Sequence, residues 1–193
     1  MTLKLITAPA AEPVLLADAK LHLRVDHIAD DDLITSLITA AREAAEHLTG
    51  RALITQTWER VLGAFPSSDR LELGKPPVAS ITSITYVDAA GDSTVMDPAD
   101  YALDDATADA VLLADTVTAW PNTYDTANAV RVRFVAGYGA AGTSVPRAIV
   151  AWMLLRIGTL YKLREEVIAG VSVSELPGGY ADRLLDPYRS WRP

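Results

Sequence analysis

The segment from residue 30 to residue 50 constrains the fold most, because it carries the clearest helical pattern in the chain. Apolar residues recur there at three- and four-residue intervals, the spacing of one helix face. They are Leu33, Ile34, Leu37, Ile38, Ala41, Ala44, Ala45 and Leu48. Asp30 can cap the start and Gly50 can end the helix, so we predict a helix over 30–49. Its charged residues are expected to face solvent or a neighbour: Arg42, Glu43, Glu46 and His47.

Two further helices flank a β-rich middle. The residue pattern favours a short helix over 16–24 and a longer one over 145–164. Between the second and third helices, residues 53–137 contain β-branched runs separated by turn residues, which is typical of strands. The sequence therefore predicts an α+β fold, with a helical core of three to four helices and a β-rich insert. We expect residues 1–179 to form a single domain.

The strands within the insert can be placed from their side-chain alternation. In 129–136, apolar Val130, Val132 and Phe134 alternate with Arg131 and Arg133, as in a half-buried strand. Another strand is predicted over 54–62. Residues 81–87 and 94–96 are predicted to pair as a hairpin, with Gly91 in the turn.

The predicted third helix is apolar around nearly its whole circumference. A helix of this kind is buried on all sides. One interpretation is that one side belongs to the core and the other to a subunit interface. The alternative is a central core helix inside a monomer. Under the first interpretation, the predicted interface residues are Trp152, Leu155 and Arg156.

Residues 180–193 follow a break at Leu176-Pro177-Gly178-Gly179. Apolar and Arg side chains of this kind are common interface anchors, so we predict a partner-binding tail with weak ties to the domain. Its predicted anchors are Leu184, Leu185, Tyr188, Arg189, Trp191 and Arg192. The alternative is a tail that packs back on its own domain.

The charge distribution limits the possible partners. The net charge is −8, and no basic residue lies between Lys75 and Arg131. That stretch contains nine acids: Asp88, Asp92, Asp97, Asp100, Asp104, Asp105, Asp109, Asp115 and Asp125. Tight DNA binding needs clustered Lys and Arg, which the sequence lacks. The acidic stretch fits a solvated surface, a bore to which DNA does not adhere, or a site for a basic partner.

Targeting, membrane and redox features are also limited. The N-terminus lacks the long apolar region of a signal peptide. The most apolar stretch, 148–155, is far shorter than the roughly 20 residues needed to cross a bilayer. The chain has no cysteine, so neither disulfides nor thiolate metal sites can form.

The motifs that carry chemistry were tested and mostly rejected. Residues 137–142 match G-x-G-x-x-G after a predicted strand, but the next helix begins several residues later and no second parallel strand follows. We interpret them as a glycine-rich connection. His27 lies among acids, yet the spacing lacks the central Gly and closing Glu of a calcium loop. We predict no catalytic, cofactor-binding or metal-binding residue, and no enzyme activity.

Several segments together resemble phage head–tail connector (adaptor) proteins of long-tailed bacteriophages, which are related to gene transfer agent adaptors. The segments follow one another in the order of that family and cover almost the whole chain. They are Pro9–Val14, Leu16–Lys20, Leu23–Asp26, Asp30–Ile34, Thr49–Trp58, Pro76-Pro77, Asp97–Tyr101, Val132–Gly139 and Leu184–Arg189. One departure is Leu15, where many relatives have Ser or Thr as a helix cap. Losing that cap costs about 1 kcal/mol.

The resemblance implies a structural virion protein of the neck, made in the host bacterial cytoplasm. It implies a homo-oligomeric ring, usually twelve-fold, docked on the portal protein. A stopper or tail-completion protein would lie below, and DNA would pass through the ring as cargo. No cofactor and no membrane association are implied. The alternative from the residues alone is a soluble small-ligand-binding module with a β-rich pocket.

Overall fold

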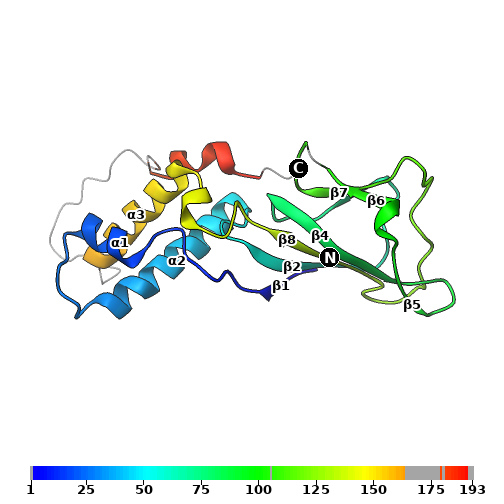
Figure 1. Ribbon diagram of the computed structural model, residues 1–193, viewed down its shortest axis with the longest axis horizontal. Coiled ribbons are helices and arrows are strands. Elements are labelled where there is room, and N and C mark those ends of the chain that lie inside the picture. Colours follow the sequence, from blue (N-terminus) through cyan, green and yellow to red (C-terminus); the bar gives the residue numbers. More distant parts are fainter. Residues whose placement is uncertain (1, 105, 164–178, 180, 191–193) are drawn as a thin grey trace. The chain divides into compact units, whose positions relative to one another are not determined.

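The computed structural model describes residues 2–104, 106–163, 179 and 181–190 (Figure 1). Helices and antiparallel sheets are both present, so the α+β class is confirmed. The chain divides into two compact units. The β unit comprises Met1–Ala10 and Thr55–Ala140, and the helical unit comprises Ala11–Ile54 and Ala141–Pro193. The arrangement expected from the sequence, a helical core with an insert, differs in one respect: the β unit also takes in the N-terminal residues.

The helical unit contains three α-helices among its described residues: α1 (Leu16–Leu23), α2 (Asp31–Thr49) and α3 (Arg147–Lys162). Short 3-10 helices accompany them: η2 (Gly142–Ser144), η3 (Asp182–Leu184) and η4 (Asp186–Tyr188). α2 packs on α3, and α1 contacts both. Apolar residues of α2 and α3 form the centre of the core: Ile34, Ile38, Ala41, Ala45, Ile149, Trp152, Met153 and Ile157.

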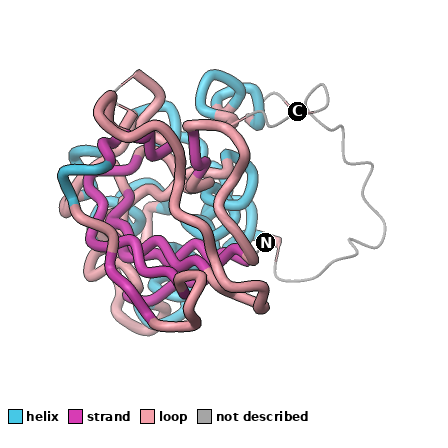
Figure 2. Tube along the Cα trace, turned by 90° about the vertical axis from the view of Figure 1, so that its right-hand side faces the viewer, coloured by secondary structure: helices cyan, strands magenta, loops and turns pink. Residues whose placement is uncertain are grey.

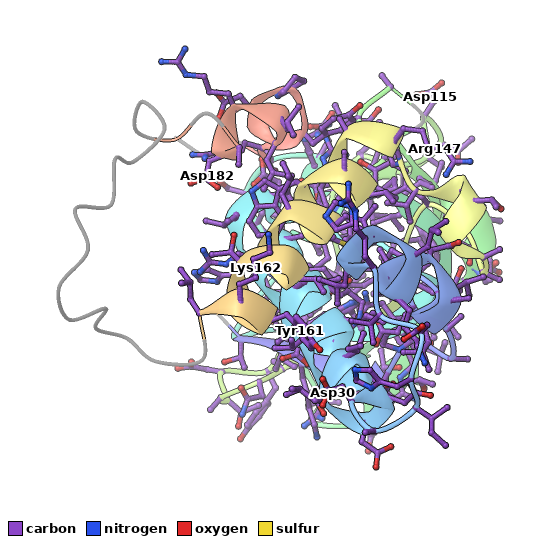
Figure 3. The ribbon with its side chains drawn as sticks, turned by 90° about the vertical axis from the view of Figure 1, so that its left-hand side faces the viewer. Asp30, Asp115, Arg147, Tyr161, Lys162 and Asp182 are labelled. Atoms are coloured by element: carbon purple, nitrogen blue, oxygen red, sulfur yellow. The ribbon has the colours of Figure 1, made fainter. Side chains whose placement is uncertain are left out.

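The helix ends partly follow the sequence prediction. Gly50 ends α2 with φ 71°, a left-handed conformation that glycine adopts without steric cost. Asp30 precedes α2 but makes no capping hydrogen bond. Its carboxylate accepts a hydrogen bond from the Tyr161 hydroxyl near the end of α3 (Figure 3). The predicted cap is therefore wrong, because the aspartate side chain connects two helices instead. Leu15 provides no side-chain cap for α1, as its side chain dictates.

The β unit contains two antiparallel sheets (Figure 2). The five-stranded sheet has the order β1-β2-β8-β4-β5 and the other has the order β3-β7-β6. The strands of the larger sheet are β1 (Thr2–Thr7), β2 (Gln56–Leu62), β4 (Val78–Val87), β5 (Ser93–Val95) and β8 (Val130–Ala136). The smaller sheet consists of β3 (Arg70–Glu72), β6 (Tyr101–Leu103) and β7 (Ala110–Leu113), and η1 (Pro98–Asp100) precedes β6.

The central strand β8 confirms the predicted alternation. Val130, Val132 and Phe134 are completely buried, whereas Arg131 and Arg133 are exposed. The predicted hairpin is also confirmed, since β4 pairs with β5 around the turn that contains Gly91. The large sheet thus has one face in the core and one face toward solvent.

Strand β1 was not predicted. It pairs with β2 along the edge of the large sheet, although both α1 and α2 lie between the two strands in the chain. All of its residues except Leu3 are exposed. An edge strand with little burial carries almost no alternation signal, so only long-range pairing reveals it.

Candidate interaction surfaces

The predicted interface residues of α3 differ in their exposure. Trp152 is buried at 3% exposure, and its indole N–H donates to Asp182 Oδ1 at 2.8 Å. Leu155 is 44% exposed, and Arg156 is exposed as well. The core side of α3 includes Trp152, Met153 and Ile157, and Leu155 lies at its margin. Arg156 follows Trp152 by four residues and therefore lies near it on the helix, yet its side chain reaches solvent. Figure 3 shows α3 with Asp182 beside it.

The exposed side of α3 separates the two interpretations of this helix. A core helix inside a monomer would bury Leu155, yet this side chain is open to solvent in the single chain. Ala151 on the same side is also exposed. Only one side of α3 thus belongs to the intramolecular core, and a subunit interface on the other side stays a prediction.

The described part of the C-terminal segment, residues 181–190, packs on its own helical unit. Leu185 is fully buried, and Leu184 and Tyr188 are half-buried. The Arg51 guanidinium donates to the Tyr188 carbonyl oxygen at 2.6 Å. The Ser190 amide donates to the carbonyl oxygen of Thr49, the last residue of α2, at 2.8 Å.

These contacts differ from the weak ties expected after the glycine break. The break is local in sequence, but Leu185 is anchored by apolar burial that the local pattern cannot reveal. Arg189 is half-buried, and its guanidinium lies 3.2 Å from the Asp186 carboxylate. The predicted anchors Trp191 and Arg192 lie outside the described residues.

A buried ionic cluster in the helical unit was missed by the sequence analysis. Arg42 and Glu46, expected to be exposed, are each only 7% exposed. Arg42 lies 2.9 Å from the Glu12 carboxylate and 3.0 Å from that of Glu46. The other Glu46 oxygen accepts the Leu53 amide at 2.9 Å. The cluster therefore joins α2 to the chain segments on both sides of it.

A signal for this cluster was present in the sequence. Arg42 and Glu46 are four residues apart, and oppositely charged residues at that spacing face each other on a helix. The interpretation failed because charged side chains are usually exposed. Here the pairing with Glu12, which is 30 residues away in the sequence, allows burial.

The glycine-rich connection follows β8, as the sequence indicated, and packs on its own chain. A Cβ atom on Gly142 would lie 2.5 Å from the Pro13 carbonyl oxygen, so only glycine fits there. Gly142 is the first residue of the short helix η2, and residues 143–146 separate it from α3. Gly142 therefore serves close backbone packing, and the α3 N-terminus is not adjacent to it as a nucleotide site would require.

The acidic stretch contains side chains with structural roles and side chains without them. Asp104 accepts hydrogen bonds from the Thr107 hydroxyl and the Arg70 guanidinium, which lower its pKa from 3.8 to about 2. Asp88 accepts the amides of Ala90 and Asp92 in the β4–β5 turn, and its pKa is lowered, chiefly by the Asp92 amide. Asp97 accepts the Ala99 amide and caps η1. Other acids of the stretch are exposed: Asp92, Asp115 and Asp125.

The β unit also has a hollow of about 410 Å³ beside two stacked aromatic rings. Phe65 and Trp120 stack with 4.9 Å between ring centroids, and the Trp120 indole donates to the Ser68 carbonyl oxygen at 2.7 Å. Among the described residues that line the hollow, Asp69 alone is acidic or basic. This is where the small-ligand alternative would place its pocket.

The described part of the chain has neither a metal-binding cluster nor a membrane-spanning helix. No group of three or more His, Cys, Asp or Glu side chains there could hold a metal ion. Asp31, one of the acids near His27, is instead paired with Lys20. Among the same residues, no helix has the length and apolarity to cross a membrane.

Known proteins resemble this chain in sequence and in fold. Residues 14–84 match the family model of the phage gp6-like head-tail connector protein. The structure matches chains in the neck of an empty GTA particle computed with C6 symmetry and in the virion of a native gene transfer agent (GTA) particle. Both matches have a TM-score of 0.80, with identities of 27% and 28%, and cover 100% of this chain and 97% of the other. The resemblance to phage head–tail connectors is confirmed.

A third match is to the neck of a native GTA particle computed with C12 symmetry, at 27% identity and a TM-score of 0.78, with the same coverage. None of the curated proteins matches the sequence. The connector match begins at Val14 and ends in β4, so it spans α1 and α2. The structural matches extend the likeness over β8, the glycine-rich connection and α3. Together they support a structural neck protein.

Proposed function

We propose that this chain is the subunit of a head–tail adaptor ring in the neck of a tailed virion or gene transfer agent particle. The ring docks on the portal and links the DNA-filled capsid to the stopper or tail, and DNA passes through it. The role is structural and non-enzymatic. It rests on one observation: the whole chain matches neck chains over 97% of their length at 27% identity.

The helical unit offers a surface for the neighbouring subunits of such a ring. Leu155 and Arg156 are exposed on α3, whereas Trp152 is buried. An apolar side chain next to a guanidinium is a common combination at protein interfaces. These two residues are therefore the part of the predicted interface that a neighbour can reach, whereas Trp152 supports the helix from within.

The portal-binding role of the C-terminal segment also belongs to this proposal. Leu185 is committed to the core of the helical unit, so it positions the segment and does not dock on the portal itself. The exposed and half-buried residues around it would supply the contact. Leu184, Tyr188 and Arg189 are the described candidates.

The proposal is tested by mixing the purified chain with portal rings and measuring the mass and symmetry of the product by sedimentation and electron microscopy. We expect a ring of chains on each portal. Leu155→Asp should leave the circular dichroism unchanged and weaken ring formation by at least about tenfold, as loss of an interface anchor does. Thr35→Asp, at an exposed position in the first turn of α2, is the matched control.

The outcomes also test the alternative function. A chain that stays monomeric with and without portal rings contradicts the adaptor ring. If that monomer also binds a small molecule with quenching of Trp120 fluorescence, the hollow beside Phe65 is the site, and the small-ligand module is the better description.

A further inference from the structure

The outward face of the large sheet carries a cluster of positive charge in a chain that is acidic overall. Glu59 is 5% exposed, and its carboxylate lies 2.8 Å from Arg133 and 3.6 Å from Arg131. Lys4 pairs with Glu59 across β1 and β2, so it lies on the same face. Two guanidinium groups thus contact the Glu59 carboxylate, and Lys4 is its cross-strand neighbour. We call Lys4, Arg131, Arg133 and Glu59 the basic face.

Strand β4, on the other side of β8 from β2, carries no charged residue that could neutralise the basic face. Arg131 and Arg133 lie opposite Thr85 and Ser83 of β4, which are uncharged. Their side chains remain 55% and 46% exposed although both contact Glu59. The sheet therefore presents two net positive charges toward solvent, within a protein of net charge −8.

The same unit carries a complementary acidic corner, formed by Asp88, Asp92 and Asp125. The β4–β5 turn contributes the first two residues. The loop with Asp125 lies against this turn, because the Tyr124 amide donates to the Val87 carbonyl oxygen at 3.0 Å and Thr123 bridges Asp88.

Two carboxylates of the acidic corner are exposed to solvent. Asp92 and Asp125 are exposed, and within the described part of the chain neither forms an ion pair. No Lys or Arg occurs anywhere between Lys75 and Arg131. Asp88 is held by backbone amides of its own turn, so Asp92 and Asp125 are the acids that a partner meets first.

A ring with rotational symmetry needs two different, complementary patches on each subunit, because each copy contacts the next one head to tail. We propose that the basic face of one copy docks on the acidic corner of the next copy. This inference rests on the ring proposed above and names the surfaces that close it. Complementary charges of this kind fix the register of subunits and exclude wrong pairings.

A second copy of the chain fits the basic face better than DNA does. Binding to the phosphate backbone needs several cations that displace counterions. Here only three are present, and Glu59 neutralises part of their charge. The acidic corner supplies charges of the opposite sign in every subunit of the ring.

The test uses charge reversal on both surfaces. Lys4→Glu/Arg131→Glu changes the four charges of the basic face from +2 to −2 and leaves the Arg133–Glu59 pair in place. Asp92→Lys/Asp125→Lys changes the acidic corner from −3 to +1. Lys4→Arg/Arg131→Lys is the control that keeps the charge. Assembly is measured by native mass spectrometry, and folding by circular dichroism.

Each reversed variant alone should need at least about tenfold more protein than the wild type to assemble, because like charges now meet. The charge-conserving control should assemble as the wild type does. An equal mixture of the two reversed variants should recover assembly, with even numbers of subunits, because reversed and natural surfaces match when the two variants alternate. Raising the salt should weaken wild-type assembly.

The outcomes separate this inference from the proposed function. A wild type that never assembles, even on portal rings, contradicts the ring itself. Folded reversed variants that assemble like the wild type, or a mixture that does not recover, overturn the contact alone. A further outcome is unaffected assembly while the wild type, and not Lys4→Glu/Arg131→Glu, lowers the electrophoretic mobility of a 30-base-pair DNA duplex. That result would show that the basic face binds DNA instead of a second copy. Should the basic-face variant misfold, the acidic-corner variant decides, since it does not touch Glu59.

Discussion

Replacing Arg42 with leucine should destabilise the helical unit, because the change leaves buried carboxylates without their cation. Arg42 lies about 3 Å from carboxylate oxygens of both Glu12 and Glu46, and it is 7% exposed. Removing one partner of a buried ion pair costs about 3–5 kcal/mol. The Glu12 side chain is 28% exposed, so water compensates part of its loss. We therefore expect a decrease of about 3 kcal/mol in the free energy of unfolding.

Urea unfolding followed by circular dichroism measures this change. With a urea dependence of about 2 kcal/mol per molar, the midpoint should fall by about 1.5 M. Glu43→Gln is the matched control, since Glu43 contacts the same guanidinium at 3.6 Å from an exposed position. Its effect should stay within about 0.5 kcal/mol.

The double variant Arg42→Leu/Glu46→Gln tests the pairing itself. Its cost should be smaller than the sum of the two single changes, because both singles remove the same interaction. A cost of less than about 1 kcal/mol for Arg42→Leu, the value of an exposed pair, would refute the argument.

Three further changes follow from the structure. Gly142→Ala should lower the melting temperature, because the added Cβ would lie 2.5 Å from the Pro13 carbonyl oxygen. Leu185→Ala should cost about 2–5 kcal/mol in urea unfolding, because it opens a cavity at a fully buried position. The pKa of Asp104 is lowered from 3.8 to about 2, so its contribution to stability is present above about pH 4 and is lost as the pH falls through 2. Asp104→Asn should remove that part of the acid dependence.

Each of these changes has a control or a result that would contradict it. Gly63→Ala adds a Cβ that meets nothing within 4 Å. Its free energy of unfolding should therefore stay within about 0.5 kcal/mol of that of the wild type. A Gly142→Ala protein that melts like Gly63→Ala contradicts the close-packing argument. Leu155→Ala, at an exposed position, should cost much less than Leu185→Ala. For Asp104, unchanged acid unfolding between pH 4 and pH 2 in Asp104→Asn is the refuting result.

The sequence by itself determined the elements whose residues repeat at short range. Ile34, Ile38, Ala41 and Ala45 share one face of a helix because of its 3.6-residue period, and the helix α2 ends at Gly50. The alternation around Phe134 likewise assigned the two faces of β8. In both cases a local period decides which side chains face the core.

Only the tertiary structure decided which distant residues meet. Strand β1 forms only by pairing with β2, which follows it in the chain after two helices. The burial of Arg42 depends on its pairing with Glu12. The position of the C-terminal segment depends on the burial of Leu185 in the helical unit. Each of these contacts joins residues far apart in the chain, so no local period records it. The basic face has the same origin, since the register of β1, β2 and β8 places Lys4 and Arg133 on either side of Glu59.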